Sequence, residues 1–175
     1  MIGSKLGDYE ILRLIGKGGM GAVYEALKPS INRRVAIKLL LPEYAEREDV
    51  VRRFLNEARA VNRVNHPGLV QIFDHGQLPD GTAYIVMELL TGETLGQRVR
   101  RLHRRLRLQD TLRLLQQVTS TLAATHAKGI VHRDLKPDNI MIVADAAVVG
   151  GERTKVLDFG IAEGRRASWD GKAAA

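Results

Sequence analysis

A short polar stretch, residues 132–139 (HRDLKPDN), carries side chains suited to acid–base and metal chemistry. It contains two carboxylates, a lysine and an amide, and a further carboxylate follows at Asp158. Apolar runs on both sides are typical of buried strands, so we expect the polar residues on a loop held by rigid structure. Such a loop can hold one base and two metal ligands in a fixed geometry. The alternative, a capped turn with solvated charges, accounts for each residue alone but poorly for the whole string.

A glycine-rich turn lies near the start of the chain, between segments expected as strands at 9–15 and 22–27. Its spacing of Gly16, Gly18 and Gly21 is also used by dinucleotide-binding folds, in which the last glycine opens a helix. Here β-forming residues follow the last glycine, so we expect a strand–turn–strand hairpin. Its backbone amides could approach phosphate oxygens without a Cβ in the way. A flexible turn without a ligand is the alternative.

A lysine, Lys38, lies among apolar residues in an expected strand at 33–41, and burying it without an anion would be costly. The next expected helix, 42–63, carries Glu57 on the same apolar stripe as Phe54. An inward lysine and an inward glutamate on neighbouring elements predict a buried ion pair. In the alternative, the lysine extends to solvent and Glu57 lies at the edge of the stripe.

The remaining pattern predicts a small antiparallel sheet followed by helices. Segments 69–73 and 83–88 are expected as paired strands, and 89–92 as the linker where the composition changes. An arginine-rich segment with leucines at helical spacing predicts an amphipathic helix with a basic outer face over 98–108. A longer amphipathic helix follows, with its apolar stripe expected at Leu112, Leu115, Val118, Leu122 and Thr125.

Length and composition favour a single soluble globular unit: 175 residues, 45% hydrophobic and 27% charged. The chain has no cysteine, which excludes a disulfide framework and a thiolate metal site. Neither a signal peptide nor a transmembrane segment is visible, so a cytoplasmic protein is expected. The net charge of +7 is concentrated in the arginine-rich segment. Nucleic acid, anionic lipid or an acidic peptide could bind there. A solvated helix face is favoured, and no nucleic-acid partner is expected because aromatic residues are not interleaved.

These motifs, in this order, resemble the catalytic domain of bacterial eukaryotic-like (Hanks-type) serine/threonine protein kinases. The resemblance covers about 8–162 and implies an α+β fold. A small antiparallel β lobe with one helix would occupy 1–90, an incomplete, mainly helical large lobe 91–162, and an irregular tail 163–175. The matching residues are the glycine turn at 16–23, V-A-I-K at 35–38, Glu57, Met87 and Glu88, the loop at 132–139, and D-F-G at 158–160.

The resemblance implies ATP and Mg²⁺ as cofactors and assigns roles by position. Asp134 would accept the proton of the substrate hydroxyl, and Lys136 would steady the γ-phosphate. Asn139 and Asp158 would hold the metal. Phe159, His132, Ile72 and Val61 would stack on one another.

The remaining implied roles concern the nucleotide. Lys38 would bind the α- and β-phosphates while paired with Glu57, and both would be needed for catalysis. Met87 would be the gatekeeper, and the backbone from Glu88 to Leu90 would hydrogen-bond adenine. The residues expected around the nucleotide are Ile15, Gly16, Lys17, Gly18, Gly19, Met20, Gly21, Val23, Ala36, Lys38, Met87, Glu88, Leu90 and Met141.

The leading hypothesis is therefore an ATP-dependent protein serine/threonine kinase. No activation segment or A-P-E motif follows Ala162, so a fragment is expected, with an exposed apolar patch on the helix around 112–122. A catalytically impaired nucleotide-binding or interaction module is the alternative, and a basic nucleic-acid-binding protein is a third hypothesis. The motifs identify neither the protein substrate nor the oligomeric state.

Overall fold

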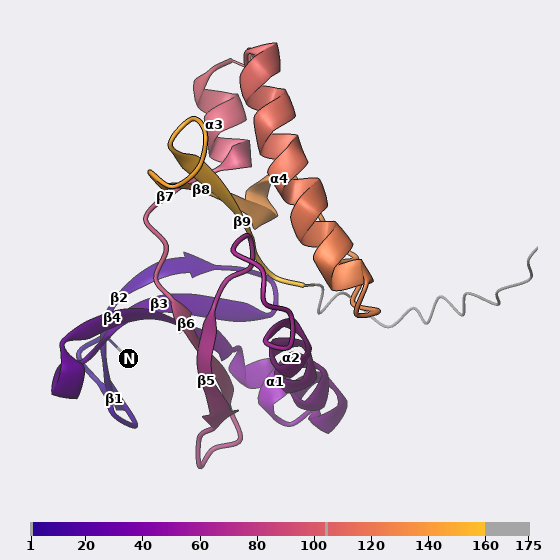
Figure 1. Cartoon of the computed structure of the whole chain (residues 1–175). Helices are drawn as coiled ribbons and strands as arrows, with labels where there is room; N and C mark the ends of the chain where they lie inside the picture. Colours follow the sequence, from indigo (N-terminus) through magenta and orange to yellow (C-terminus); the bar gives the residue numbers. More distant parts are fainter. Residues whose placement is uncertain (1, 104, 160–175) are drawn as a thin grey trace, which may run out of the picture.

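Two β-sheets, each accompanied by helices, make up the computed structural model, which describes residues 2–103 and 105–159 (Figure 1). The larger sheet has six antiparallel strands in the order β1-β2-β3-β4-β6-β5. The elements of this part are β1 (Lys5–Leu6), β2 (Tyr9–Lys17), β3 (Gly21–Lys28), η1 (Pro29–Ile31), β4 (Arg33–Leu40), α1 (Pro42–Ala45), α2 (Glu48–Val61), β5 (Ile72–Gln77) and β6 (Ala83–Glu88).

The second part contains a three-stranded antiparallel sheet in the order β7-β8-β9. In Figure 1 it lies with its two helices above the larger sheet, and residues 89–91 connect the two parts. Its elements are β7 (Gly92–Thr94), α3 (Leu95–Arg101), α4 (Leu108–His126), η2 (Pro137–Asn139), β8 (Ile140–Ala144) and β9 (Glu152–Val156). The α+β kinase-like arrangement predicted from the sequence is confirmed. The predicted tail, 163–175, lies outside the described residues.

Strand alternation gives the larger sheet two apolar faces. Val35, Ile37 and Leu39 of β4 belong to a buried cluster formed with β1, β2, β3 and β6. On the opposite face Leu40 packs under α2, together with the fully buried Phe54. Because side chains two apart share a face, the face that α2 covers at Leu40 continues along the strand to Lys38 and Ala36.

The single helix predicted over 42–63 is wrong, because the chain forms α1 and α2 with a break between them. Arg47 is extended (φ −93°, ψ 89°) and serves as the N-cap of α2. Glu48 and Asp49 occupy the first turn of α2. Carboxylates there interact favourably with the positive end of the helix dipole, which favours a new helix start at this point.

The strand predicted at 69–73 is also shifted, since β5 begins only at Ile72. Leu69 instead forms a parallel bridge with Val156 of β9. The Val156 amide donates to the Gly68 carbonyl at 2.8 Å. The segment before β5 therefore joins the smaller sheet, which ties the two parts of the structure together.

The arginine-rich helix predicted over 98–108 has both ends wrong. Helix α3 begins at Leu95 with a capping box, in which Thr94 and Gln97 each bond the other's backbone. It ends at Arg101, and His103 then adopts a left-handed backbone (φ 49°). Most of the arginines in this segment bind carboxylates of the chain; Arg100, Arg101 and Arg107 remain largely exposed, as a solvated face requires, whereas Arg98 and Arg113 do not.

Arg98 is the centre of these ion pairs. Its guanidinium donates to Glu93 and to Glu152, each at 2.8 Å, and its side chain is 17% exposed. Arg101 adds a second contact to Glu93 at 2.6 Å, and Arg113 a second contact to Glu152 at 3.2 Å. These pairs fasten α3 and α4 to the ends of β7 and β9. Further pairs are Arg100–Asp138 and Arg107–Asp110, while Arg104 lies outside the described residues.

Helix α4 buries a stripe that matches the predicted one at Val118 and Thr125 but not at Leu112 and Leu115. The buried residues are Leu114, Val118, Thr121 and Thr125. The threonine hydroxyls are satisfied within the helix, at 2.9 Å from the carbonyls of residues 117 and 122, so they can lie in the core. Leu108, Leu112 and Leu115 are instead 72%, 59% and 47% exposed, which agrees with the apolar patch expected on this helix. Among the described helices, none has the length and apolar character needed to cross a membrane.

We predict that Arg98→Met lowers the free energy of unfolding by about 2 kcal/mol, because two half-buried carboxylates lose a charged donor. Arg107→Met is the matched control: its side chain is 86% exposed, and its loss should cost less than about 1 kcal/mol. Urea denaturation of both variants measures the difference. Equal destabilisation by the two would show that the Arg98 pairs do not hold the second part of the structure together.

Candidate active site

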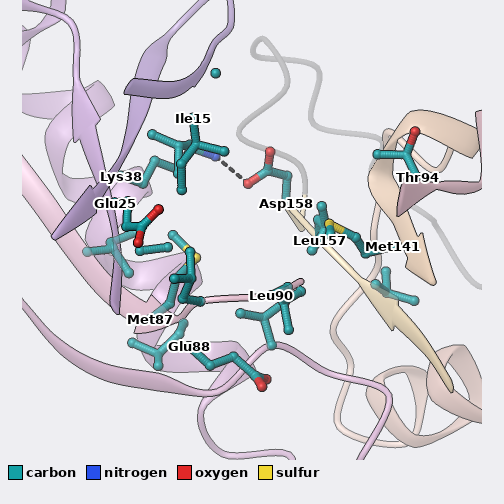
Figure 2. Close-up of a pocket in the computed structure, with 18 of the residues that line it drawn as sticks. Ile15, Glu25, Lys38, Met87, Glu88, Leu90, Thr94, Met141, Leu157 and Asp158 are labelled. Atoms are coloured by element: carbon teal, nitrogen blue, oxygen red, sulfur yellow. Dashed lines mark hydrogen bonds and ion pairs between the residues drawn. The ribbon is translucent and has the colours of Figure 1, made fainter. Parts of the chain in front are cut away.

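A cavity of about 710 Å³ opens between the larger sheet and β8 and β9 (Figure 2). Its size is that of pockets which enclose small ligands. The sheet contributes apolar residues and Lys38, the linker contributes backbone, and the segment after β9 contributes Asp158. The predicted nucleotide residues that line it are Ile15, Gly16, Val23, Ala36, Lys38, Met87, Glu88, Leu90 and Met141.

The structure does not bring the rest of the glycine turn into the lining of this cavity, although 17–21 were predicted around the nucleotide. A Cβ on Gly19 would meet open space, and one on Gly18 would only touch the Gly21 carbonyl oxygen at 3.9 Å. Met20 packs against the apolar cluster under α2. A Cβ on Gly21 would lie 2.7 Å from the Leu39 carbonyl oxygen, so glycine is needed here for the close approach of β3 to β4.

Lys38 reaches from β4 toward the far side of the cavity. Its backbone lies opposite Val23 of β3 and Ile85 of β6, and its side chain is 14% exposed. The ammonium forms an ion pair with Oδ1 of Asp158, drawn as a dashed line in Figure 2. The predicted pair with Glu57 is therefore wrong for this structure: no ion pair between Lys38 and Glu57 is present among the described residues.

Glu57 is left with a half-buried carboxyl group. Its Oε2 atom is buried and makes no hydrogen bond within the described part of the chain. Burial raises the pKa of Glu57 to about 7, although the positive charges of Lys38 and Arg133 act to lower it. A large fraction of this group is thus protonated near neutral pH. The physical reason is that Lys38, the cation expected to neutralise it, is engaged by Asp158.

The catalytic-loop residues predicted at 134–139 do come together. Lys136 donates to Oδ2 of Asp134 at 2.7 Å, and this hydrogen bond holds the pKa of Asp134 below its usual range. The side-chain amide of Asn139 donates to the Asp134 carbonyl at 2.8 Å and to its Oδ2 at 3.2 Å. Asp134 is therefore a fixed, ionised carboxylate that can accept a hydrogen bond.

His132 holds this loop against the segment that carries Asp158. Its buried ring donates from Nε2 to the Leu157 carbonyl at 2.8 Å. The ring centroid also lies 4.7 Å from that of Phe159. Phe159 belongs to one apolar cluster with Val61 and Ile72, so the four residues expected to stack do pack together.

The oxygen atoms of Asn139 and Asp158 suit a magnesium ion. Because Asn139 uses its Nδ2 on Asp134, its Oδ1 is left for a hard cation. The Asp158 carboxylate is 51% exposed at the cavity. No cluster of three or more acidic or histidine residues that could hold a metal occurs in the described ranges. Magnesium binds through one or two carboxylates together with substrate phosphates and water, so these two ligands fit a site completed by a phosphorylated ligand.

Three charged residues line the same cavity but were not predicted. Glu25 is only 2% exposed; it forms an ion pair with Arg13 at 2.6 Å and accepts a hydrogen bond from Arg34 at 2.7 Å. These residues extend the cleft wall across β2, β3 and β4. Strand alternation could have found them, since each lies two positions from a predicted cleft residue: Ile15, Val23 and Ala36.

Glu88 is one of the residues that line the cavity, but its carboxylate points away from Lys38 and Asp158 (Figure 2). Behind the linker this carboxylate accepts hydrogen bonds from the backbone N–H of Gln71 at 2.7 Å and from the Lys155 ammonium at 2.6 Å. Lys155 also donates to the Leu69 carbonyl at 3.0 Å. The network joins β6, the approach to β5 and β9, so it fixes the linker backbone relative to both sheets.

Comparison with known proteins assigns the family. The sequence model of the protein kinase domain family matches residues 9–170 of this chain. The chain belongs to the protein kinase family. This kinase domain is 42% identical over 161 residues to the serine/threonine-protein kinase PknA of Mycobacterium tuberculosis, covering 90% of this chain and 36% of PknA. It is 40% identical over 163 residues to PrkC of Bacillus subtilis, covering 93% of this chain and 24% of PrkC.

The kinase fold is shared with solved structures as well. The crystal structure of the Mycobacterium tuberculosis PknI kinase domain matches with a TM-score of 0.77 and 28% identity, over 93% of this chain and 64% of that chain. This kinase chain thus spans about a third or less of the curated relatives named above and about two thirds of the solved domain. The names of those relatives agree with the serine/threonine kinase resemblance found in the sequence.

We predict that the raised pKa of Glu57 makes the stability of this kinase domain pH-dependent. The unfolded carboxyl titrates near 4.5 and the folded one near 7, so between these values the folded state holds the extra proton. Stability should fall as pH rises from about 5 to about 7 and level off above that range. The melting temperature of Glu57→Gln should lack this decline, whereas the exposed control Glu46→Gln should follow the wild type. A wild-type decline that persists in Glu57→Gln would contradict the assignment.

We also predict that Lys155→Met lowers the free energy of unfolding by about 3 kcal/mol, because it strands the carboxylate of Glu88 between the two sheets. Lys128→Met, at an exposed position after α4, is the matched control. Chemical denaturation monitored by circular dichroism gives both values. A loss no larger than that of the control would show that the linker is held by other contacts.

Proposed function

We propose that the chain is the ATP-binding part of a serine/threonine protein kinase, which transfers the γ-phosphoryl group of Mg-ATP to a protein hydroxyl. One observation carries the proposal. Lys38, Asp158 and the loop that carries Asp134 and Asn139 are three separate segments of the chain, yet Lys38 contacts Asp158 across one cavity and Asn139 contacts Asp134 beside it. Phosphoryl transfer depends on positioning and charge neutralisation, which is what such a cluster can supply.

Nucleotide binding would use the two ends of the cavity differently. Apolar side chains from both sheets, including Val23, Ala36 and Met141, would enclose the base, and the backbone of 88–90 would hydrogen-bond its edge. At the other end the Lys38 ammonium would contact the α- and β-phosphates. Support for this direction comes from the charges, because Lys38 and Asp158 lie at the same end of the cleft (Figure 2).

Asn139 and Asp158 would hold magnesium, which when bound neutralises phosphate charge and orients the transferred group. Asp134 would orient the attacking hydroxyl by accepting its hydrogen bond. Its lowered pKa keeps it ionised at neutral pH, so it accepts the proton late instead of removing it beforehand. Lys136, bonded to Asp134 at 2.7 Å, would place a positive charge next to the transferred phosphoryl group. The Lys136–Pro137 sequence after Asp134, and the names of the relatives, support serine and threonine as acceptors.

A nucleotide-binding module without transferase activity is the second candidate. It is favoured by the engagement of Lys38 with Asp158 and by the unpaired carboxyl of Glu57, because both differ from the arrangement that the kinase mechanism requires. In that case the cavity would bind Mg-ATP and no phosphoryl group would leave it.

The decisive test is transfer of labelled phosphate from ATP to a generic protein substrate in the presence of Mg²⁺. We predict that Asp134→Asn lowers the rate by about 100-fold or more, because it removes the carboxylate that orients the hydroxyl. Nucleotide binding should survive in this variant, since Asp134 does not line the predicted base and phosphate positions.

The matched control is Asp8→Asn, an exposed carboxylate remote from the cavity, which should retain wild-type transfer. Thermal stabilisation by ATP and Mg²⁺ without any transfer by the wild type would establish the binding module instead. Absence of both transfer and stabilisation would contradict both candidates.

A further inference from the structure

The first turn of α3 packs closely against the end of the catalytic loop, where Gly96 meets the side chain of Asp138. Gly96 of α3 is buried. A Cβ built on Gly96 would lie 2.3 Å from Oδ1 and 2.9 Å from Cγ of Asp138. The carboxylate of Asp138 thus occupies the space that any other residue at position 96 would need. The contact exists only because position 96 has no side chain.

The same carboxylate is also held by charge. Arg100, one turn further along α3, donates from its guanidinium to Oδ1 of Asp138 at 3.0 Å. The two side chains are 65% and 53% exposed. Exposed pairs of this kind contribute little to folding stability, so stability does not explain the arrangement. Together the contacts of Gly96 and Arg100 set where the Asp138 side chain lies.

Asp138 is the residue before Asn139, within the short helix η2. Pro137 restricts the backbone on one side of it. On the other side Asn139 is only 9% exposed and donates to the Asp134 carbonyl and carboxylate at 2.8 and 3.2 Å. A shift of the Asp138 backbone would therefore move the side chains proposed to hold the metal and to orient the hydroxyl.

Helix α3 is itself fixed at the mouth of the cavity. Thr94 and Gln97, which form its capping box, line the cleft, and Thr94 lies opposite Met141 in the β7–β8 ladder (Figure 2). One side of this first turn thus faces the cavity while Gly96 faces the catalytic loop. The helix is a rigid support shared by the two.

We propose that Asp138 is a positioning residue: α3, through Gly96 and Arg100, holds Asp138 so that Asn139 is placed for the divalent cation. This inference rests on the proposed function, because it concerns the metal that the nucleotide brings. Removing a group that orients a metal ligand typically weakens metal affinity about 10- to 100-fold. We expect an effect at the lower end of that range, since Asp138 acts through the backbone.

The test measures Mn²⁺ affinity by electron paramagnetic resonance, on the full chain with a non-hydrolysable ATP analogue. Gly96→Ala is the sharpest variant, because alanine favours a helix more than glycine does but forces the Asp138 carboxylate away. We expect Gly96→Ala and Asp138→Ala each to weaken Mn²⁺ binding about tenfold, with no fall in melting temperature for Gly96→Ala. Asp138→Asn, which keeps an oxygen for Arg100, should restore most of the affinity.

Two comparisons make the result specific. In the double variant Gly96→Ala/Asp138→Ala the glycine change should have no further effect, because the clashing carboxylate is gone. Arg101→Ala, which removes another arginine of α3 and its ion pair with Glu93 of β7, should bind Mn²⁺ like the wild type. Where activity is measurable, kcat should fall more than the KM for nucleotide rises.

Wild-type affinity in both Gly96→Ala and Asp138→Ala would overturn the positioning role and leave the proposed function intact. Additive effects in the double variant would overturn it as well. A wild-type chain that binds neither nucleotide nor Mn²⁺ would instead overturn the proposed function, and this inference with it.

Discussion

One ammonium group, that of Lys38, lies near enough to two carboxyl groups, those of Asp158 and Glu57, to influence both. In the structure it neutralises Asp158, at the end of β9, and leaves Glu57 of α2 without an ion pair among the described residues. The carboxyl group left over keeps a proton because a buried charge without a partner is costly. A divalent cation at Asp158 would compete with Lys38 for that carboxylate. Lys38 would then be available to Glu57 and to phosphate oxygens, so metal, nucleotide and helix position are linked through a single charge.

This competition requires that the two sheets keep a fixed separation. The network of Glu88 and Lys155 fixes the linker behind the cavity, and the bridge between Leu69 and Val156 joins the sheets next to it. His132 then binds the catalytic loop to the segment of Asp158 through the Leu157 carbonyl. None of these groups lies where the phosphates are expected. They support the site from behind, and rigid support of this kind is what electrostatic catalysis depends on.

The sequence predicted which residues form the site better than it predicted which of them form ion pairs with each other. Alternation along β4 correctly turned Lys38 inward, and the catalytic loop followed from the string 132–139. Which acid Lys38 would bind could not be predicted, because Glu57 and Asp158 are both available and distance in the fold decides between them. The stripe of α4 was predicted correctly at Val118 and Thr125, but Thr121 was missed because a threonine that satisfies its hydroxyl within the helix can be buried. Arg98 was expected in solvent with the other arginines of α3, but it is largely buried against Glu152, which lies 54 positions away in the sequence.

The central claim is that one cavity binds a nucleotide and a divalent cation through Lys38, Asn139 and Asp158. Anomalous diffraction from crystals grown with Mn²⁺ and a non-hydrolysable ATP analogue tests it most directly. We expect a metal peak within about 2.2 Å of Oδ1 of Asn139 and of an Asp158 oxygen, with the phosphates against Lys38. A metal bound elsewhere, or a nucleotide outside this cavity while Lys38 stays on Asp158, would contradict it.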